Sequence, residues 1–113
     1  MTIKSVVGGA SPGKILSDVS LEKAFHFHTG IGMYTGKYAT SLVHFSRILE
    51  QIDSKSIEFH LTRKDFENWI RFLGDNALSL QLAKLRKKNV AGEKLRAEVL
   101  KVVRARLDRP KSP

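Results

Sequence analysis

Apolar residues recur at helical spacing in four segments after residue 40, and this pattern does most to constrain the fold. The first segment begins at Ser41, whose hydroxyl is suited to cap a helix, and it closes at residues 53–54. The second follows a capping-box pattern at residues 62–65 and ends at Gly74, a typical helix stop. Their inward residues are Leu42, Phe45, Ile48, Leu49 and Ile52 in the first segment and Phe66, Trp69, Ile70 and Leu73 in the second.

Two further helices are predicted in the C-terminal part of the chain. Asp75 can cap one that ends before Gly92, and the other spans residues 93–108. The inward residues are Leu78, Leu82 and Leu85 in the former and Leu95, Val99, Val102, Val103 and Leu107 in the latter. Arg96 and Arg106 fall inside the second apolar arc. We expect either that they lie along its edges or that this face is half-buried and meets a partner.

The segment before these helices alternates with period two. Within residues 24–29, Phe25 and Phe27 alternate with histidines, which predicts a half-buried strand. Residues 30–36 then form a glycine-rich turn, and residues 37–39 return as a short second strand. The expected fold is therefore α+β, mainly α, with a short N-terminal β-hairpin followed by about four packed helices.

Residues 56–61 fit two interpretations. The apolar residues alternate as in a strand, yet Ser56 is also suited to cap a short helix that directs Ile57, His60 and Leu61 inward. Periodicity alone does not choose between them.

The length and composition predict one domain. We expect a flexible arm over residues 1–20, a globular domain over residues 21–108 and a tail over residues 109–113. No apolar run approaches the roughly 18 residues of a membrane span, and no signal peptide is apparent, so we expect a cytoplasmic protein with no membrane partner. The chain has no cysteine, which excludes disulfides and thiolate ligands.

Positive charge is concentrated at the C-terminal end. The formal net charge is +9, and residues 84–113 alone hold eleven Lys and Arg against three Asp and Glu. A one-sided basic surface is typical of proteins that bind phosphate, although a merely solvated helix face is the alternative. The predicted nucleic-acid-binding residues are Lys84, Arg86, Lys87, Lys88, Lys94, Lys101, Arg104 and Arg109.

Two glycine-rich segments resemble anion-binding loops. Residues 8–14 match the start of a phosphate-binding loop, but Ile15 replaces the hydroxyl that would hold Mg²⁺, so a flexible arm is the better interpretation. The second combines exposed amides with a lysine and a following helix N-terminus. Its candidate anion-binding residues are Gly30, Gly32, Gly36 and Lys37, and a simple hairpin turn is the alternative.

The four histidines do not define a site. His26 and His28 share a strand face and have the spacing of a chelating pair, but no third ligand can be assigned. No Ser-His-Asp triad of a hydrolase can be assigned from the sequence either. We therefore expect no catalytic residue, no metal and no cofactor.

Several motifs over residues 24–107 resemble a prokaryotic, largely archaeal, domain family of unknown function. The matching patterns are TGxxAxSLxxF at Thr35–Phe45, SxxxH at Ser56–His60, DFxxW at Asp65–Trp69 and LGD at Leu73–Asp75. Two departures are Lys64, where relatives often have Gly, and Ser79, where Ala is common. The resemblance implies a hairpin followed by packed helices, with residues 56–61 helical, and it transfers no catalytic residue. His60 near Asp65 would then form a polar joint between two helices.

These observations favour a non-enzymatic protein that binds nucleic acid or a ribonucleoprotein without sequence specificity, through its C-terminal helices. The alternative is a protein-interaction or regulatory module that uses the Phe/Trp helix or the last helix. A hydrolytic or metal-dependent enzyme ranks third.

Overall fold

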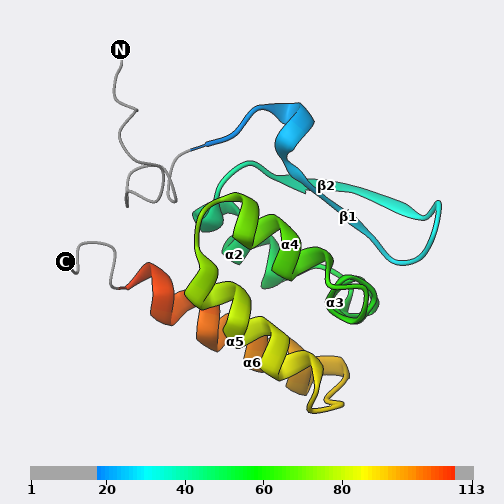
Figure 1. The fold of residues 1–113 in the computed structure, drawn as a ribbon. Coiled ribbons are helices and arrows are strands. Elements are labelled where there is room, and N and C mark those ends of the chain that lie inside the picture. The colour runs from blue at the N-terminus through cyan, green and yellow to red at the C-terminus, as the bar shows by residue number, and fades with distance from the viewer. Residues whose placement is uncertain (1–17, 109–113) are drawn as a thin grey trace.

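The computed structural model describes residues 18–108 and consists of a hairpin packed on five helices (Figure 1). The short 3-10 helix η2 (Leu21–Lys23) leads into the antiparallel strands β1 (Phe25–His28) and β2 (Tyr34–Ala39). The helices are α2 (Leu42–Leu49), α3 (Ser54–Thr62), α4 (Asp65–Phe72), α5 (Asn76–Arg86) and α6 (Gly92–Leu107). The predicted α+β, mainly α, fold is confirmed, and residues 54–62 supply the additional helix.

The elements form layers, with the hairpin on one side and the last two helices on the other (Figure 1). The hairpin packs on α2 and α3, and α6 packs on the same two helices from the opposite side, next to α5. Residue 19, just before the expected domain boundary at Leu21, also contacts the rest of the domain. The Val19 amide donates to the Thr40 carbonyl (2.7 Å), and Val19 packs against the core. The expected arm at residues 1–17 and the tail at residues 109–113 lie outside the described residues.

The hairpin turn is shorter than predicted. The Thr29 amide donates to the Met33 carbonyl and the Met33 amide to the Gly30 carbonyl, each at 3.0 Å, so the turn closes at Met33 and β2 begins at Tyr34. The predicted second strand at residues 37–39 is therefore too short. Gly36, expected in the turn, lies within β2 at φ +86°, at a β-bulge opposite β1. Its positive φ is accessible because glycine has no Cβ.

Local capping explains where most helices begin. Ser41 Oγ accepts from the His44 amide (3.1 Å) and Asp75 Oδ1 from the Leu78 amide (3.1 Å), as the sequence predicts. The structure settles the ambiguous segment in favour of a helix. Its cap is Asp53, whose carboxylate accepts from the Lys55 amide (2.9 Å), so Ser56 lies buried inside α3 rather than at its N-terminus.

The capping box predicted at residues 62–65 does not form. Thr62 is still part of α3, and only Arg63 and Lys64 separate that helix from α4. Lys64 reverses the chain in the left-handed conformation, at φ 72° and ψ 13°, and its side chain caps nothing. Because the chain turns within two residues, Thr62 completes the preceding helix and cannot cap the next one.

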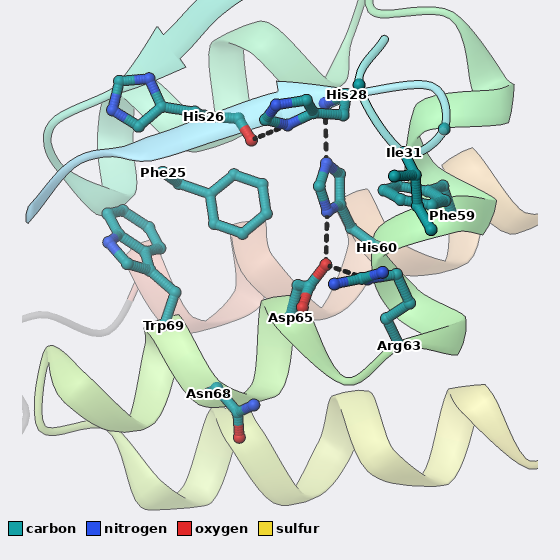
Figure 2. Close-up of a pocket in the computed structure, with 12 residues that line it drawn as sticks. Phe25, His26, His28, Ile31, Phe59, His60, Arg63, Asp65, Asn68 and Trp69 are labelled. Carbon is teal, nitrogen blue, oxygen red and sulfur yellow. Dashed lines mark hydrogen bonds and ion pairs between the residues drawn. The ribbon is translucent and has the colours of Figure 1, made fainter. Parts of the chain in front are cut away.

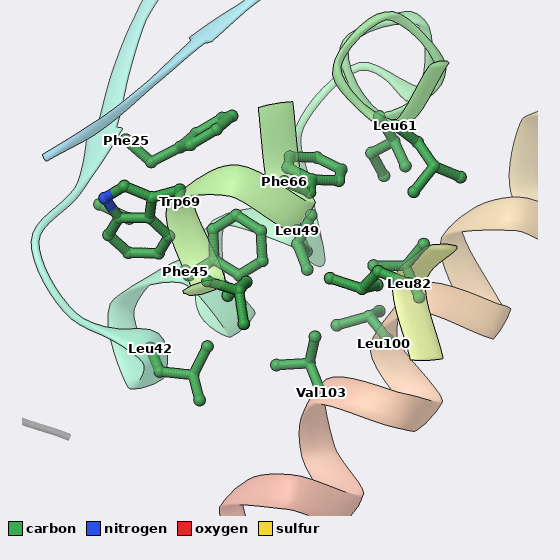
Figure 3. Packing of buried hydrophobic residues seen from close by; sticks show 14 of the residues in the cluster. Phe25, Leu42, Phe45, Leu49, Leu61, Phe66, Trp69, Leu82, Leu100 and Val103 are labelled. Atoms are coloured by element: carbon green, nitrogen blue, oxygen red, sulfur yellow. The ribbon is translucent and has the colours of Figure 1, made fainter. Parts of the chain in front are cut away.

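A cluster of aromatic rings joins the hairpin to the helices (Figure 3). Phe25 packs edge-to-face against Phe45 and Trp69, with both pairs of ring centroids 5.7 Å apart. Phe66 meets Phe45 at 5.1 Å, while the aliphatic side chains of α5 and α6 extend the same core. Most residues predicted to face inward are buried, whereas Ile48, Val102 and Leu107 are only partly buried, and Leu100 is an additional buried residue of α6.

The two arginines inside the apolar arc of α6 lie at its edges and bind other parts of the domain. Arg96 Nη1 donates to the Leu49 carbonyl (2.6 Å), and Arg106 pairs with the buried carboxylate of Asp75. These contacts tie α6 to α2 and to the start of α5. Within residues 18–108, no helix has the length and apolar character needed to cross a membrane.

Candidate functional site

Seven of the eight predicted nucleic-acid-binding residues lie on the described part of the chain. Lys84, Arg86, Lys87 and Lys88 are at the C-terminal end of α5, and Lys94, Lys101 and Arg104 are on α6. Arg109 lies outside the described residues. The structure divides these seven side chains into two groups according to whether they form ion pairs.

Three of them pair with carboxylates of the domain. Arg86 donates to Glu67 through Nε (2.6 Å) and Nη2 (3.3 Å), and Glu67 is itself buried in α4. These hydrogen bonds raise the pKa of Arg86 above its ordinary value. Arg104 pairs with Glu50 at 2.5 Å, and Lys88 pairs loosely with Glu98 at 3.6 Å. Arg86 thus connects α4 to α5 and has little freedom to meet a ligand.

The other four are exposed lysines, Lys84, Lys87, Lys94 and Lys101, which make no ion pair with residues 18–108. We call them the lysine group. α5 and α6 pack against each other and are joined by a short turn, which brings Lys84 and Lys87 toward the start of α6 (Figure 1). Lys94 and Lys101 are seven residues apart, so they share one face of α6 with about 10 Å between them along the axis.

The residues of the candidate anion-binding loop lie in two different elements. Gly30 and Gly32 are at the tip of the hairpin, whereas Gly36 and Lys37 are inside β2, beyond the turn. The Lys37 amide donates to Thr35 Oγ1 (3.1 Å). The following helix N-terminus is occupied by the Ser41 cap. The early closure of the turn therefore places two of the four residues at the hairpin tip and two in a strand.

A pocket that the sequence does not reveal lies between the hairpin tip and the junction of α3 and α4 (Figure 2). Its volume is about 770 Å³. Gly30, Ile31 and Gly32 form one rim. The other lining side chains include Phe25, His28, Phe59, Arg63, Asp65 and Trp69.

A chain of hydrogen bonds fixes the floor of this pocket (Figure 2). The His28 amide donates to His60 Nε2 (2.8 Å), so this ring nitrogen carries no proton. His60 Nδ1 therefore carries the proton and donates to Asp65 Oδ2 (2.8 Å). The predicted polar joint between two helices is confirmed, and it also holds β1. Burial lowers the pKa of His60 and thereby keeps the ring neutral, although the hydrogen bond to Asp65 acts in the opposite direction.

Arg63 is held at the edge of the pocket by two neighbours. Its Nε donates to Asp65 Oδ2 (3.1 Å), and its guanidinium lies over the Phe59 ring, 4.9 Å from the centroid. Half of the Arg63 side chain remains exposed. The two terminal nitrogens make no hydrogen bond to residues 18–108. They are therefore positioned donors without a partner in the described part of the chain.

The histidine pair of β1 does not form a metal site in the described residues. His26 uses both ring nitrogens, with Nδ1 facing the Tyr34 hydroxyl (3.2 Å) and Nε2 facing the Leu21 carbonyl (3.2 Å). His28 Nδ1 lies 3.1 Å from the His26 carbonyl and donates to it, which leaves Nε2 as its acceptor. No group of three metal-binding side chains occurs within residues 18–108.

Sequence reasoning missed the pocket because its walls come from three separate segments. The available signals were the alternation of Phe and His in β1 and the paired motifs around His60 and Asp65. Neither shows that the hairpin tip and the α3–α4 junction face each other, since this depends on how the hairpin packs.

The fold and these surfaces define a small hairpin-and-helix domain with a basic end and a separate aromatic pocket. The chain belongs to a family of unknown function, DUF5752, whose model matches residues 9–104. No curated protein and no solved structure matches this chain significantly.

Proposed function

We propose that this protein binds nucleic acid, alone or within a ribonucleoprotein, without sequence specificity and through the lysine group on α5 and α6. The observation that carries this proposal is that the four residues of the lysine group make no ion pair with residues 18–108, whereas Arg86, Lys88 and Arg104 do. An exposed lysine that makes no internal ion pair has no such interaction to break before it binds a phosphate. The counterions released from the nucleic acid then favour binding.

The proposal does not depend on most of the arginines near the basic end. Arg86, Arg96 and Arg106 each bond to groups of the same domain, and their roles are structural. The alternative, a protein-interaction module, would have to use the parts of α4 and α6 outside the core. Trp69 of α4 and Val99 of α6 are buried, whereas Phe72 of α4 is exposed.

Fluorescence anisotropy with labelled duplex DNA and single-stranded RNA at several salt concentrations tests the proposal. Four phosphate contacts predict a slope of log K against log salt of about −3.6 for duplex DNA and about −2.8 for a single strand. Replacing all four residues of the lysine group by Gln should remove most of this dependence and most of the affinity.

The matched control changes four exposed cations elsewhere, Lys23, Lys37, Arg47 and Lys55, to Gln. Both variants lose four positive charges, so a difference in affinity between them reports the position of the charges rather than the net charge. Equal weakening in both variants would contradict the proposed surface. Absence of binding by the unmodified protein at low salt would contradict the function itself.

A further inference from the structure

We propose that the pocket between the hairpin tip and the α3–α4 junction holds one unstacked base of a single-stranded nucleic acid. This inference rests on the proposed function and extends it from phosphate contact to base contact. It is carried by the volume of the pocket, the side chains that line it and its place in the fold.

The walls suit a flat ring. Phe59 is half-buried, and its ring already stacks with the Arg63 guanidinium. Phe25 and Trp69 also line the pocket, largely buried, and the His60 ring lies between Phe25 and Phe59 (Figure 2). Aromatic side chains and arginine planes are the surfaces on which proteins stack unpaired bases. The volume of about 770 Å³ is also within the usual range for small-ligand pockets, about 300–1,000 Å³.

The polar groups favour a neutral ligand with both donors and acceptors on its edge. The charges of Arg63 and Asp65 offset each other, and His60 is neutral. The terminal nitrogens of Arg63 are donors, whereas His28 Nε2 is an acceptor. A nucleobase presents such a mixed edge, whereas a simple anion would meet Asp65 at the bottom of the pocket.

The α3 helix lies between the pocket and the start of α6, where Lys94 of the lysine group is found. Phe59 of α3 and Arg63, the residue after this helix, line the pocket, while Glu58 of α3 accepts from the Gly92 amide (2.7 Å) at the start of α6. A helix with its side chains is about 10 Å across. A strand whose phosphates meet the lysine group can therefore pass α3 and place a neighbouring base in the pocket. Bases of a duplex are paired and stacked, so this arrangement predicts a preference for single strands.

The first experiment compares a single-stranded RNA with a duplex of the same length by anisotropy. The test variant is Phe59→Leu, which keeps an apolar side chain and removes the ring, and thermal unfolding checks that it folds. We expect single-strand affinity to fall by about 5- to 150-fold, the loss typical of one stacking residue, with duplex affinity unchanged. Arg63→Gln, which removes the second stacking surface, should act in the same direction. Equal effects on both nucleic acids, or no effect on either, would overturn the base pocket.

The second experiment isolates the pocket from the phosphate contacts. Adenosine and uridine carry no phosphate, and the chain has one tryptophan, Trp69, whose indole N–H gives one NMR signal. Millimolar adenosine or uridine should shift this signal and the amides of Gly30 and Gly32 in the unmodified protein and in the lysine-group variant, but not in Phe59→Leu. If neither nucleoside shifts these signals, the base pocket is wrong even where duplex binding persists. If they shift while no polymer binds, the proposed function fails and the pocket stands as a nucleoside site.

Discussion

Lys64→Gly should stabilise the domain, because Lys64 holds a conformation that costs an L-residue energy. Its φ of 72° and ψ of 13° lie in the left-handed region between α3 and α4. That conformation costs a residue with a Cβ about 1–2 kcal/mol. Glycine avoids this cost but gives back about 0.5–1 kcal/mol through the greater freedom of the unfolded chain. The net gain is about 0.75 kcal/mol at the midpoint of these ranges, equivalent to about 3–6 °C in Tm for a domain of this size.

Urea unfolding followed by circular dichroism measures this gain, and two variants control for other causes. Lys64→Ala removes the charge but keeps the Cβ, so it should leave the free energy of unfolding nearly unchanged. Asn89→Gly changes the other left-handed residue, at φ 59°, and should gain less because asparagine tolerates this region. If Lys64→Gly were no more stable than Lys64→Ala, the argument from backbone strain would be refuted.

Three further predictions concern the core, the neutral histidine and the paired arginine. Phe27→Ala should lower the free energy of unfolding by about 3–5 kcal/mol because Phe27 is fully buried. Ile31→Ala, on the exposed hairpin tip, should change it by less than about 0.5 kcal/mol. Chemical denaturation measures both values, and similar losses in the two variants would contradict the packing. The unfolded chain protonates His60 at its ordinary pKa of about 6.5, whereas burial lowers the pKa in the folded state, so stability should be full above that pH and decline as the pH falls below it. Urea midpoints across pH 5–8 for the unmodified protein and His60→Gln test this, and parallel pH profiles would count against it. Arg86→Gln should lower Tm because it leaves the buried Glu67 carboxylate unpaired, but it should preserve duplex DNA binding in anisotropy. Loss of binding by a folded variant would show instead that Arg86 contacts the nucleic acid.

The sequence by itself determined the features that depend on neighbouring residues. The Ser41 and Asp75 caps act on amides three residues away, and the buried faces of the helices follow from the 3.6-residue period. Periodicity also predicted the strand at β1, and composition showed that positive charge gathers near the C-terminus. These patterns were sufficient for the fold class because caps and amphipathic faces are local properties of the chain.

Short segments between elements were predicted less well. Residues 56–61 fit both a strand and a helix, and the helix prevailed because Asp53 caps it and its inner face joins the core. The box at residues 62–65 failed because the chain reverses at Lys64. In each case the outcome depended on where the neighbouring helices had to lie.

Only the tertiary structure decided which polar groups are free to act. Arg86 and Lys87 are adjacent and similar in sequence, yet one is bound to Glu67, nineteen residues away, and the other is exposed. The pocket likewise exists because the His28 amide meets His60 across 32 residues. Contacts of this kind join residues distant in the chain, and their formation depends on how the hairpin and helices pack together. Local sequence patterns therefore predicted which groups are present, while packing determined which of them remain available to a ligand.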